Sequence, residues 1–466
     1  MKTVAIIGGG ISGLAVAEAA RRHAAELGFE LRTVVLEAEA GAGGKIGTIR
    51  DGGYVIEKGP HGFLDKEPKA MALIDRLGLR ASLLPADAAA ETRYIVRGGR
   101  LRALPSSPPA FITSDVLPLF GKLRVMLEPL IAKKSDASEE SVWAFAARRI
   151  GKPAADILVD AMVTGIYGGD PKRLSVQAAF PLLADLERKH GGLIRGQIAK
   201  AREAKRLGSG GPSMGGPRGV LHSFRAGLAE LIDALASGSS LELGFRARRI
   251  ELRTGGGFRV AAEDGRAIDA DAVVVTAPAD AMAELVRPFG EAEAESLRSI
   301  RYVPVVVVVH AFMRDAITGP AEGFGFLAPN LEGREILGSI WASSVFRGHA
   351  PEGQVMLRTL LGGARRPELA DGDDATLAAR AKRELTALIG LRADAPPQLE
   401  RVIRWPRAIP QYELGHGARV VAAEALEART SGLFLGGNAL RGVAMIQCVA
   451  DADRVAARAA DWLARQ

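Results

Sequence analysis

The chain has 466 residues, 48% of them hydrophobic, and a formal net charge of +7 at pH 7. This length suits about three domains with large cores, and the modest, scattered charge gives no support for nucleic-acid binding. Cys448 is the only cysteine, which excludes an internal disulfide and any cysteine-rich metal site, so we predict no metal and a reducing compartment. No run approaches the roughly 20 apolar residues of a membrane span, and we expect no signal peptide before the first strand.

The N-terminal segment is typical of a dinucleotide-binding unit of strand, loop and helix. An apolar run at 4–7 is followed by a loop with Gly8, Gly10, Ser12 and Gly13, and then by an Ala-rich helix. Gly8 permits the tight turn, Gly10 lets the backbone approach a pyrophosphate, and Gly13 lets helix and strand pack closely. The helix N-terminus faces the negative charge of such a ligand, so all four residues are predicted cofactor contacts.

A second predicted strand, 33–36, ends in Glu37, where dinucleotide folds place an acidic side chain that holds a ribose hydroxyl. Gly43, Gly44 and Lys45 follow shortly afterwards. A glycine pair at this place resembles the extended FAD motif of the amine oxidase and protoporphyrinogen oxidase flavoproteins. Small residues let the chain pass close over the pyrophosphate, and their N–H groups can form an anion nest. FAD is therefore the predicted cofactor, rather than a nicotinamide dinucleotide.

The middle of the chain changes character several times. Helical spacing of apolar residues recurs at 117–131, 142–150 and 154–163. A glycine-rich stretch at 207–217 predicts a flexible boundary loop. Strand patterns follow at 241–245, 250–253 and 257–262. The apolar run 271–278 then returns the chain to the nucleotide-binding domain as a parallel strand. Residues 280–405, with the β-branched run 303–309, predict a mostly antiparallel sheet.

The C-terminal segment contains a second glycine turn that leads into a helix. A strand at 433–435 precedes Gly437 and Asn438, and Val443 and Ala444 precede the last helix. The helix N-terminus could approach a flavin, where its partial positive charge favours negative charge on the reduced ring. These four residues are predicted cofactor contacts, and the alternative is a purely structural turn.

The whole chain resembles the protoporphyrinogen oxidase family. The resemblance runs from end to end and depends on motifs in the middle of the chain that amine oxidases lack. These motifs are Glu57-Lys58-Gly59-Pro60 with Phe63-Leu64, Leu104-Pro105, Gly165-Ile166-Tyr167-Gly168-Gly169, Gly323-Phe324-Gly325-Phe326-Leu327 and Ile409-Pro410-Gln411-Tyr412.

This resemblance implies an α/β fold with three parts. The FAD-binding, Rossmann-like domain would comprise the three segments 1–86, 218–280 and 407–466. A substrate domain with a mixed or antiparallel sheet would comprise 87–105 and 281–406. A helical domain at 106–206 would associate with the membrane. Its amphipathic stretches carry Lys122, Arg124, Lys133 and Lys134, which suits reversible binding to a membrane surface rather than a span.

The resemblance also implies the reaction. FAD would oxidise protoporphyrinogen IX to protoporphyrin IX in haem biosynthesis, removing six electrons in three two-electron steps, with dioxygen as the acceptor. Because the cofactor carries the redox chemistry, the protein needs positioning groups, apolar walls and a carboxylate anchor more than a nucleophile. The partners would be a reduced tetrapyrrole, dioxygen and the inner face of the cell membrane. The protein would be cytoplasmic and peripheral, and a homodimer stays open.

Several residues stand at family positions of the substrate site. Arg93 matches an arginine that holds a propionate, a role that suits a guanidinium because it can bond a carboxylate at two points. Phe324 and Leu327 match residues that sandwich a pyrrole ring, and Leu360 and His61 are further predicted substrate contacts. Without the resemblance, we would interpret Arg93 as a surface residue. Phe324 and Leu327 would be interpreted as a pair of core residues.

Gly165 matches a glycine that faces the reacting carbon, so it is the predicted catalytic residue. The absence of a side chain would admit the macrocycle, and its carbonyl would stabilise positive charge as hydride leaves; a helix-breaking turn is the alternative. Gly59 and Pro60 are predicted cofactor contacts. The chain departs from the family twice: His61 stands where several relatives carry Asn, and Gly41 where they usually carry Arg.

Three other functions stay open at this stage. A coproporphyrinogen III oxidase of the same family would act on a substrate with four propionates. An amine or polyamine oxidase would need an aromatic cage beside the flavin, which the five Tyr and four Trp of the chain permit but do not indicate. A non-catalytic carrier would bind flavin and tetrapyrrole without turnover.

Overall fold

The computed structural model describes residues 1–136, 138–206 and 219–466. The boundary loop predicted at 207–217 lies outside them. The chain divides into two compact units, each assembled from separate segments. Unit 1 comprises Met1–Pro85, Val220–Arg301 and Ala418–Gln466, and unit 2 comprises Ala86–Gly219 and Tyr302–Gly417.

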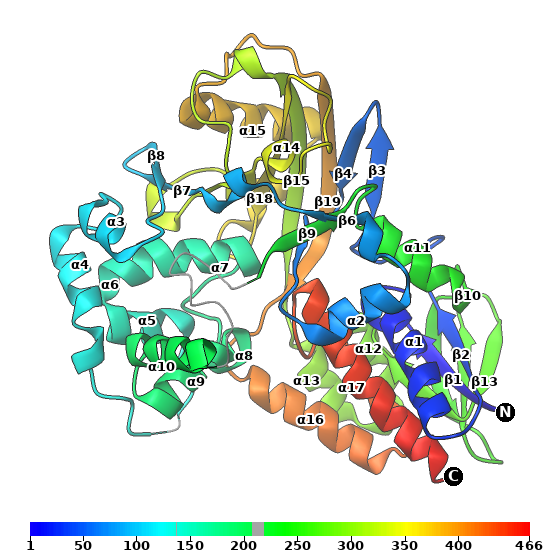
Figure 1. Ribbon diagram of the computed structural model, residues 1–466. Helices are drawn as coiled ribbons and strands as arrows, with labels where there is room; N and C mark the ends of the chain where they lie inside the picture. The colour runs from blue at the N-terminus through cyan, green and yellow to red at the C-terminus, as the bar shows by residue number, and fades with distance from the viewer. Residues whose placement is uncertain (137, 207–218) are drawn as a thin grey trace. The chain divides into compact units, whose positions relative to one another are not determined.

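Unit 1 is built on a parallel five-stranded sheet with the order β10-β2-β1-β14-β20 (Figure 1). The strands are β1 (Lys2–Ile7), β2 (Leu31–Leu36), β10 (Ser240–Glu242), β14 (Ala272–Val275) and β20 (Leu433–Leu435). β1 lies in the middle and pairs with β2 on one side and β14 on the other. All of β14 and the last four residues of β1 are buried. Burial on both faces explains why these strands are continuous apolar runs in the sequence.

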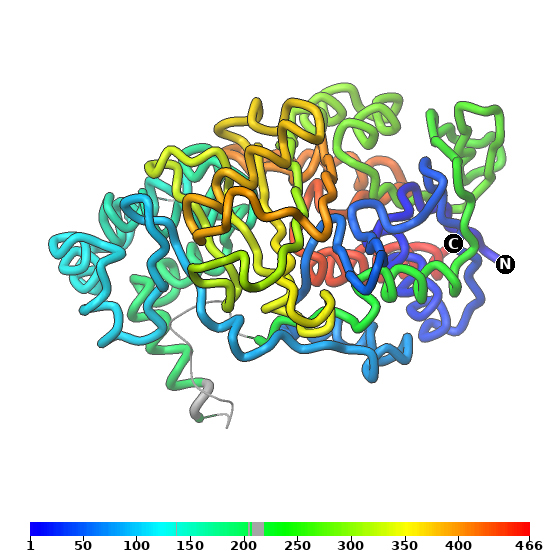
Figure 2. Tube along the Cα trace, turned by 90° about the horizontal axis from the view of Figure 1, so that it is seen from above, coloured from blue at the N-terminus to red at the C-terminus, as the bar shows by residue number. Residues whose placement is uncertain are grey.

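Seven helices belong wholly or mostly to the described part of unit 1. They are α1 (Ile11–Glu26), α2 (Pro68–Arg76), α11 (Ala229–Ser237), α12 (Ala279–Val286), α13 (Glu291–Arg298), α16 (His416–Arg429) and α17 (Met445–Ala464). α1 and α17 pack together in one apolar core with the sheet, although they come from opposite ends of the chain. Figure 2 shows the two helices, blue and red, side by side near both termini.

Smaller antiparallel elements complete unit 1. They are the sheet β11 (Ala247–Leu252), β12 (Phe258–Ala262) and β13 (Ala267–Ala270), the hairpin β3 (Thr48–Asp51) and β4 (Tyr54–Glu57), and the sheet β5 (Phe63–Leu64), β9 (Leu221–Phe224) and β6 (Leu83–Pro85). The hairpin ends at Glu57, the first residue of the motif that contains Gly59 and Pro60. The position of the hairpin therefore determines where these two residues lie in unit 1.

Unit 2 contains a seven-stranded mixed sheet with the order β19-β15-β18-β17-β16-β7-β8. The strands are β7 (Arg93–Arg97), β8 (Arg100–Ala103), β15 (Tyr302–Met313), β16 (Gly325–Leu327), β17 (Gly338–Ile340), β18 (Gln354–Gly362) and β19 (Leu399–Pro410). Neighbours run antiparallel except β7 and β16, which are parallel. The predicted strand 303–309 is confirmed within β15, and its pairing with β19 shifts register at Pro304, which has no N–H for the ladder.

Two sets of helices cover the two faces of this sheet. α15 (Asp374–Ile389) packs against one face, over alternate residues such as Val306 and Leu357. The residues between them point to the other face, where Ile95 and Leu327 contact Ala161 of α7 and Val116 of the segment between α3 and α4. The sheet therefore presents one face to α15 and, at β7 and β16, the opposite face to the helical part of unit 2.

The helical part of unit 2 follows β8. Its helices are α3 (Pro108–Thr113), α4 (Leu119–Met126), α5 (Val142–Ile150), α6 (Lys152–Ala154), α7 (Asp160–Tyr167), α8 (Val176–Ala179), α9 (Pro181–His190) and α10 (Leu193–Arg206). A π-helical turn, Ala155–Val159, joins α6 to α7. Across the described residues, no helix combines the length and the apolar character that crossing a membrane requires.

Candidate functional site

The first glycine loop of unit 1 connects β1 directly to α1. Gly8 has a φ of +111°, a conformation that favours glycine, and its N–H donates to the carbonyl of Leu36 over 2.9 Å. A Cβ atom on Gly13 would lie 1.8 Å from the Gly8 carbonyl oxygen, so only glycine lets α1 begin this close to β1. A Cβ atom on Gly10 would meet no atom of the described residues closer than 3.9 Å, which leaves the backbone there open to a ligand.

The second glycine loop lies against the first. The N–H of Gly43 donates to the Gly9 carbonyl over 2.8 Å, and Gly10 pairs with Gly43 in a short parallel bridge. Gly43 and Gly44 both have positive φ, +111° and +58°. No described side chain caps the start of α1 at Gly10. The N-terminal N–H groups of α1 therefore suit an anionic ligand such as a pyrophosphate.

Glu37 and the motif after β4 hold these two loops in place. Glu37 is buried, and its carboxylate accepts the N–H of Gly9 over 2.6 Å and the N–H of Glu39 over 2.8 Å. A Cβ atom on Gly59 would lie 2.0 Å from the carbonyl oxygen of Lys45. The segment of Gly59 and Pro60 thus packs directly on the second loop.

The C-terminal glycine turn reaches the same place. Gly437 has a φ of +89°, and a Cβ atom built on it would lie 3.6 Å from the Cβ of Ser12 in the first loop. Its N–H donates to the buried carboxylate of Asp451 over 3.0 Å. Asn438 follows in this turn, and Val443 and Ala444 precede α17. All the residues predicted to contact the cofactor therefore lie in unit 1, and segments from both ends of the chain converge at the loops that follow β1 and β2.

Cys448 packs as a small apolar residue. It lies in α17 within the core of unit 1, and its Sγ donates to the Gly442 carbonyl over 3.3 Å. Burial raises the pKa of the Cys448 thiol to about 11. The thiol is therefore protonated at neutral pH and has little nucleophilic character.

The predicted substrate residues other than His61 lie in unit 2, and three of them, Arg93, Leu327 and Leu360, are on the sheet face that looks toward the helical part. Side chains two residues apart on a strand share a face, so the strand register places them in rows. One row contains Arg93, Gly325, Ile340 and Arg358, and the next contains Ile95, Leu327, Gly338 and Leu360. Gly338 stands between Leu327 and Leu360, and a Cβ atom on it would lie 3.2 Å from Cδ2 of Leu327. The second row is therefore apolar, and Leu327 packs against the glycine.

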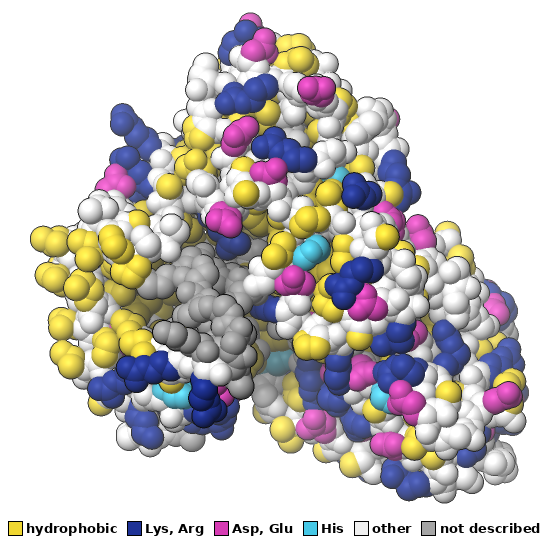
Figure 3. Space-filling model, viewed as in Figure 1, with side chains coloured by type: hydrophobic (Ala, Val, Ile, Leu, Met, Phe, Trp, Pro, Cys, Tyr) yellow, Lys and Arg dark blue, Asp and Glu magenta, His cyan; other side chains and the backbone are white. Residues whose placement is uncertain are grey.

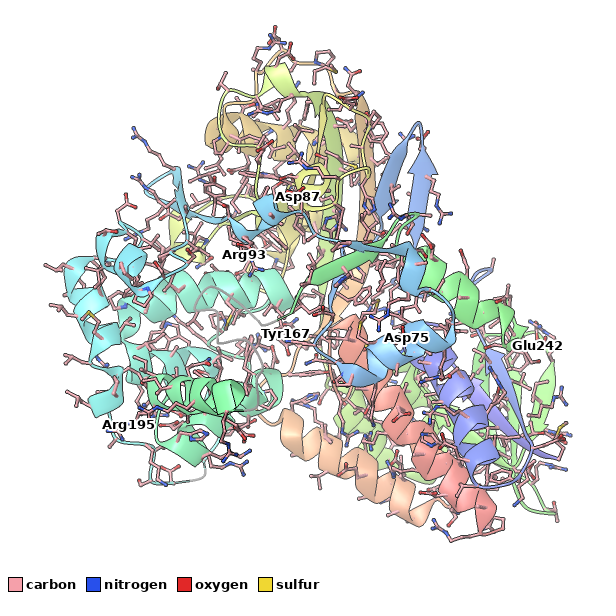
Figure 4. The ribbon with its side chains drawn as sticks, in the orientation of Figure 1. Asp75, Asp87, Arg93, Tyr167, Arg195 and Glu242 are labelled. Atoms are coloured by element: carbon pink, nitrogen blue, oxygen red, sulfur yellow. The ribbon has the colours of Figure 1, made fainter. Side chains whose placement is uncertain are left out.

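Arg93 is prearranged by its neighbour. Its guanidinium carbon lies 5.0 Å from the centre of the Phe324 ring, a cation–π contact. The Phe324 N–H donates to the Thr92 carbonyl over 2.8 Å, which ties the residue before β16 to the residue before β7. Burial lowers the pKa of Arg93, although an arginine stays charged at neutral pH. Figure 4 shows Arg93 between β7 and α7.

Gly165 faces the same apolar row from the last turn of α7. A Cβ atom on Gly165 would lie 3.0 Å from Cδ1 of Leu327. The four last carbonyl groups of a helix lack partners within the helix and form the negative end of its dipole. The backbone of Gly165 thus combines close contact to the apolar row with a partial negative charge. The structure places Gly165 against Leu327, and Leu360 stands in the same row as Leu327. Arg93 belongs to the neighbouring row and contacts the ring of Phe324. His61 belongs to unit 1, where it is buried next to Pro60.

The sequence analysis missed the polar residues that hold these groups. Asp451 accepts the N–H of Gly437 in the C-terminal glycine turn, and Glu427 accepts the N–H of Leu435 just before it. Arg365 pairs with Asp160 at the start of α7. No local pattern could have revealed them, because each contact joins residues from different elements.

The pattern that defines flavin-containing amine oxidoreductases matches residues 11–460, nearly the whole chain. The chain belongs to this family. It is an oxidoreductase enzyme, and its cofactor is FAD, because the fold that carries the flavin is a dinucleotide-binding fold. The glycine loops, the uncapped start of α1 and the open backbone at Gly10 fit this cofactor. The predicted α/β flavoprotein fold and the predicted FAD are confirmed.

The chain is also similar to individual proteins whose names indicate a substrate. The chain is 33% identical to the chloroplastic protoporphyrinogen oxidase of Nicotiana tabacum over 99% of its own length and 86% of the relative's. It is 28% identical to the coproporphyrinogen III oxidase of Bacillus subtilis over 96% of both chains. Among solved structures, a protein of Exiguobacterium sp. assigned as a protoporphyrinogen oxidase covers 98% of both chains with 25% identity and a TM-score of 0.81. Putrescine oxidase shares the fold at 15% identity, with a TM-score of 0.70 over 100% of this chain and 99% of the other.

Proposed function

We propose that the enzyme oxidises protoporphyrinogen IX to protoporphyrin IX, with dioxygen as the electron acceptor. The observation that carries this proposal is the pair of rows in unit 2: a charged guanidinium stacked on Phe324 stands next to an apolar row faced by Gly165. A flat apolar macrocycle with carboxylate side chains is complementary to this arrangement. The tobacco relative and the Exiguobacterium structure support the same substrate.

The predicted substrate residues in unit 2 and the facing Gly165 would have distinct roles. Arg93 would bind a propionate at two points, and the ring of Phe324 would keep the guanidinium oriented for it. Leu327 and Leu360 would form the apolar wall against the macrocycle. Gly165 would let the macrocycle approach α7, and its carbonyl would favour positive charge at the carbon that loses hydride. FAD, when bound, supplies the acceptor for each pair of electrons.

The nucleotide-binding residues would have a separate role in this reaction. The N–H groups of the first and second glycine loops would hold the pyrophosphate, with Lys45 beside them. Glu37 would hold the ribose, as predicted from the sequence. The turn at Gly437 and Asn438 and the start of α17 would contact the flavin end. His61 would lie beside the cofactor, as its place in the motif after Glu57 implies.

A coproporphyrinogen III oxidase is the second candidate, and one feature of unit 2 favours it. The row that begins with Arg93 contains a second arginine, Arg358, three strand positions away. With strands about 4.8 Å apart, the two lie roughly 14 Å apart at the backbone. A substrate with four carboxylates needs more cationic partners than one with two.

One experiment separates these functions. The oxidised, FAD-containing enzyme is mixed without oxygen with protoporphyrinogen, coproporphyrinogen or a polyamine, and the flavin absorbance is followed. Rapid bleaching by protoporphyrinogen supports the first proposal, and faster bleaching by coproporphyrinogen supports the second. Bleaching by the polyamine alone contradicts both. If no compound bleaches the flavin, the carrier function becomes the better interpretation.

We also propose that the helical part of unit 2 binds the inner face of the cell membrane from the cytoplasm. Helices α3 and α4 and the 3₁₀ turn Glu128–Leu130 expose a set of large apolar side chains, which we call the apolar helical surface: Ile112, Leu119, Phe120, Leu123, Met126, Leu127 and Leu130. Leu119 is 73% exposed and Phe120 65%. Figure 3 shows this surface as the yellow area over α3 and α4.

The charge around this surface supports contact with anionic lipid. Lys122 and Arg124 lie in α4 itself, and Lys133 follows shortly after the 3₁₀ turn. A groove of about 450 Å³ runs between α4 and Pro153, lined by Phe120, Leu123 and Leu127. An amphipathic helix with basic neighbours binds a membrane surface reversibly. A homodimer that buries the same surface is the alternative arrangement.

A further inference from the structure

Arg365 connects the strand that carries Leu360 to the helix that carries Gly165. It follows β18, and its guanidinium reaches α7 at two points one helical turn apart. Nη1 pairs with the carboxylate of Asp160, and Nη2 donates to the Thr164 hydroxyl over 2.8 Å. Asp160 and Thr164 are buried, and the side chain of Arg365 is 18% exposed. Thr164 directly precedes Gly165.

Asp160 extends the connection to the neighbouring strand. Its second carboxylate oxygen accepts the N–H of Asn330 over 2.8 Å. Asn330 begins a 3₁₀ turn, Asn330–Glu332, that closely follows β16 and therefore Leu327. One buried carboxylate thus links α7 to the segment after β18 and to the segment after β16.

The C-terminal end of α7 is held by the segment that follows β18. The N–H of Ala364, next to Arg365, donates to the carbonyl of Gly168 over 2.7 Å. The side-chain amide of Gln411 donates to the carbonyl of Tyr167 over 2.9 Å. Figure 4 labels Tyr167 at this end of α7. The last two turns of the helix are therefore tied to the sheet at both ends, with Gly165 between the ties.

We propose that Arg365 is a positioning residue, which with Asp160 sets the depth at which the backbone of Gly165 meets Leu327. Gly165 and Leu327 are closely packed, because a methyl group added to Gly165 would lie 3.0 Å from Cδ1 of Leu327. The forked guanidinium is needed, since it bonds Asp160 and Thr164 at the same time, which an ammonium group does less well. This inference rests on the proposed roles of Gly165 and Leu327 in the substrate site.

The kinetic test compares Arg365→Ala, Arg365→Lys and a control on the next residue. Arg365→Ala should lower kcat by roughly tenfold to a hundredfold, because displacement of a reacting group by about 1 Å can cost that much. KM should stay close to the wild-type value, since Arg93 still binds the carboxylate. Arg365→Lys should recover part of the loss. Arg366→Ala is the control, because the side chain of Arg366 is 42% exposed and its one ion pair among the described residues is with Glu368.

A double-mutant cycle with Gly165→Ala separates positioning from general damage. In the wild-type background the added methyl presses on Leu327, so kcat and the melting temperature should both fall. In the Arg365→Ala background α7 can retreat from the leucine, so the same substitution should cost less in both measurements. Fully independent effects of the two substitutions would overturn the proposal. So would an unchanged kcat in Arg365→Ala.

Failure of the proposed function gives a different result. In that case the wild-type enzyme oxidises neither porphyrinogen, whereas the melting temperatures of the cycle still report whether Arg365 presses Gly165 against Leu327. Oxidation of a porphyrinogen by the wild type with no coupling in the cycle would refute the positioning role alone.

Discussion

Arg93 differs from the other arginine of its strand in what surrounds its guanidinium. Arg97, four residues further along β7, pairs with Glu332 at 3.2 Å. Arg93 instead stacks on Phe324, and burial lowers its pKa. A ring contact leaves the edge of the guanidinium able to donate two parallel hydrogen bonds. The two arginines thus form a matched pair for testing the carboxylate anchor.

Arg93→Ala should raise the KM for the porphyrinogen by about tenfold to a hundredfold, if the lost charge-assisted bonds are worth roughly 1.5–3 kcal/mol. Arg93→Lys should restore part of this loss, because an ammonium group keeps the charge without the fork. Steady-state kinetics checks both, and flavin content should stay normal. Arg97→Ala should leave KM unchanged. An Arg93→Ala enzyme with wild-type KM, or one whose only defect is lost flavin, would return Arg93 to a structural role.

Two glycines of the nucleotide-binding loops give opposite expectations for the same substitution. A Cβ atom on Gly13 would collide with the Gly8 carbonyl at 1.8 Å, whereas none of the described atoms lies within 4 Å of a Cβ on Gly41. Gly13→Ala should therefore force α1 away from β1 and abolish FAD binding. The Gly41→Ala enzyme should bind FAD as the wild type does. The flavin-to-protein absorbance ratio of the purified enzymes measures this difference. Normal flavin content in Gly13→Ala would show that the first loop does not hold the cofactor.

At the scale of whole elements, the local sequence predicted structure where one segment decides its own conformation. The glycine loop after 4–7 predicted β1 and α1, and 142–150 matches α5. The helix predicted at 117–131 is wrong at both ends, because α4 begins after Pro118 and stops before Pro129. Proline disfavours helix in the residue before it and removes an N–H from the helix interior. The strand predicted at 241–245 is also too long, since Gly244 turns with a φ of +63°.

What could not be predicted depends on contacts between distant segments. The parallel pairing of β10 with β2 and the π-helical turn before α7 have no local signature in the sequence. For the site, the glycine motifs identified the cofactor, and Arg93, Phe324 and Leu327 were proposed only through the family resemblance. Asp160 and Arg365, which hold α7 and Gly165 against the sheet, would be interpreted from sequence alone as solvated charges. Their meaning depends on burial, which the sequence does not show.

The apolar helical surface makes a prediction at the level of α4. Replacing Leu119 and Phe120 together by Ser should reduce binding to vesicles of anionic lipid, because these two side chains are largely exposed and contribute little to the core. Sedimentation with vesicles measures the bound fraction, which high salt should also lower if Lys122 and Arg124 contribute. The control replaces Val421, an exposed apolar residue in α16 of unit 1, by Ser. Equal binding by all variants would contradict the membrane proposal, and a dimer that dissociates in the double variant would favour self-association.

For the molecule as a whole, one buried histidine should make stability depend on pH. His310 in β15 is fully buried, lies 3.1 Å from Glu400 on β19 and stacks on Phe312. Burial lowers the pKa of His310, outweighing the attraction of Glu400, and Lys382 adds to the lowering. The unfolded chain therefore binds more protons than the folded one between the folded pKa and the ordinary value near 6.5.

The contribution of neutral His310 to stability is complete above pH 6.5 and is lost as the pH falls through the lowered pKa of the folded state. His310→Phe keeps a ring against Phe312 but cannot titrate. The difference in melting temperature between wild type and this variant should thus shift in favour of the variant as the pH is lowered from 7 to 5. A difference that stays constant over this range would show that His310 does not titrate on unfolding.

The order of the unit 1 sheet has a consequence for how the protein is made. β1 is synthesised first, but its neighbour β14 and the outer strand β20 come from residues 272–275 and 433–435, and α1 needs α17 to cover it. At roughly 5–20 residues per second, the ribosome leaves the start of the nucleotide-binding fold without its partners for on the order of half a minute or more. The apolar strands of unit 1 are exposed during this interval, whereas both segments of unit 2 are complete earlier. Newly made chains should therefore need a chaperone until α17 emerges from the ribosome. The cofactor can bind only after α17 has been synthesised.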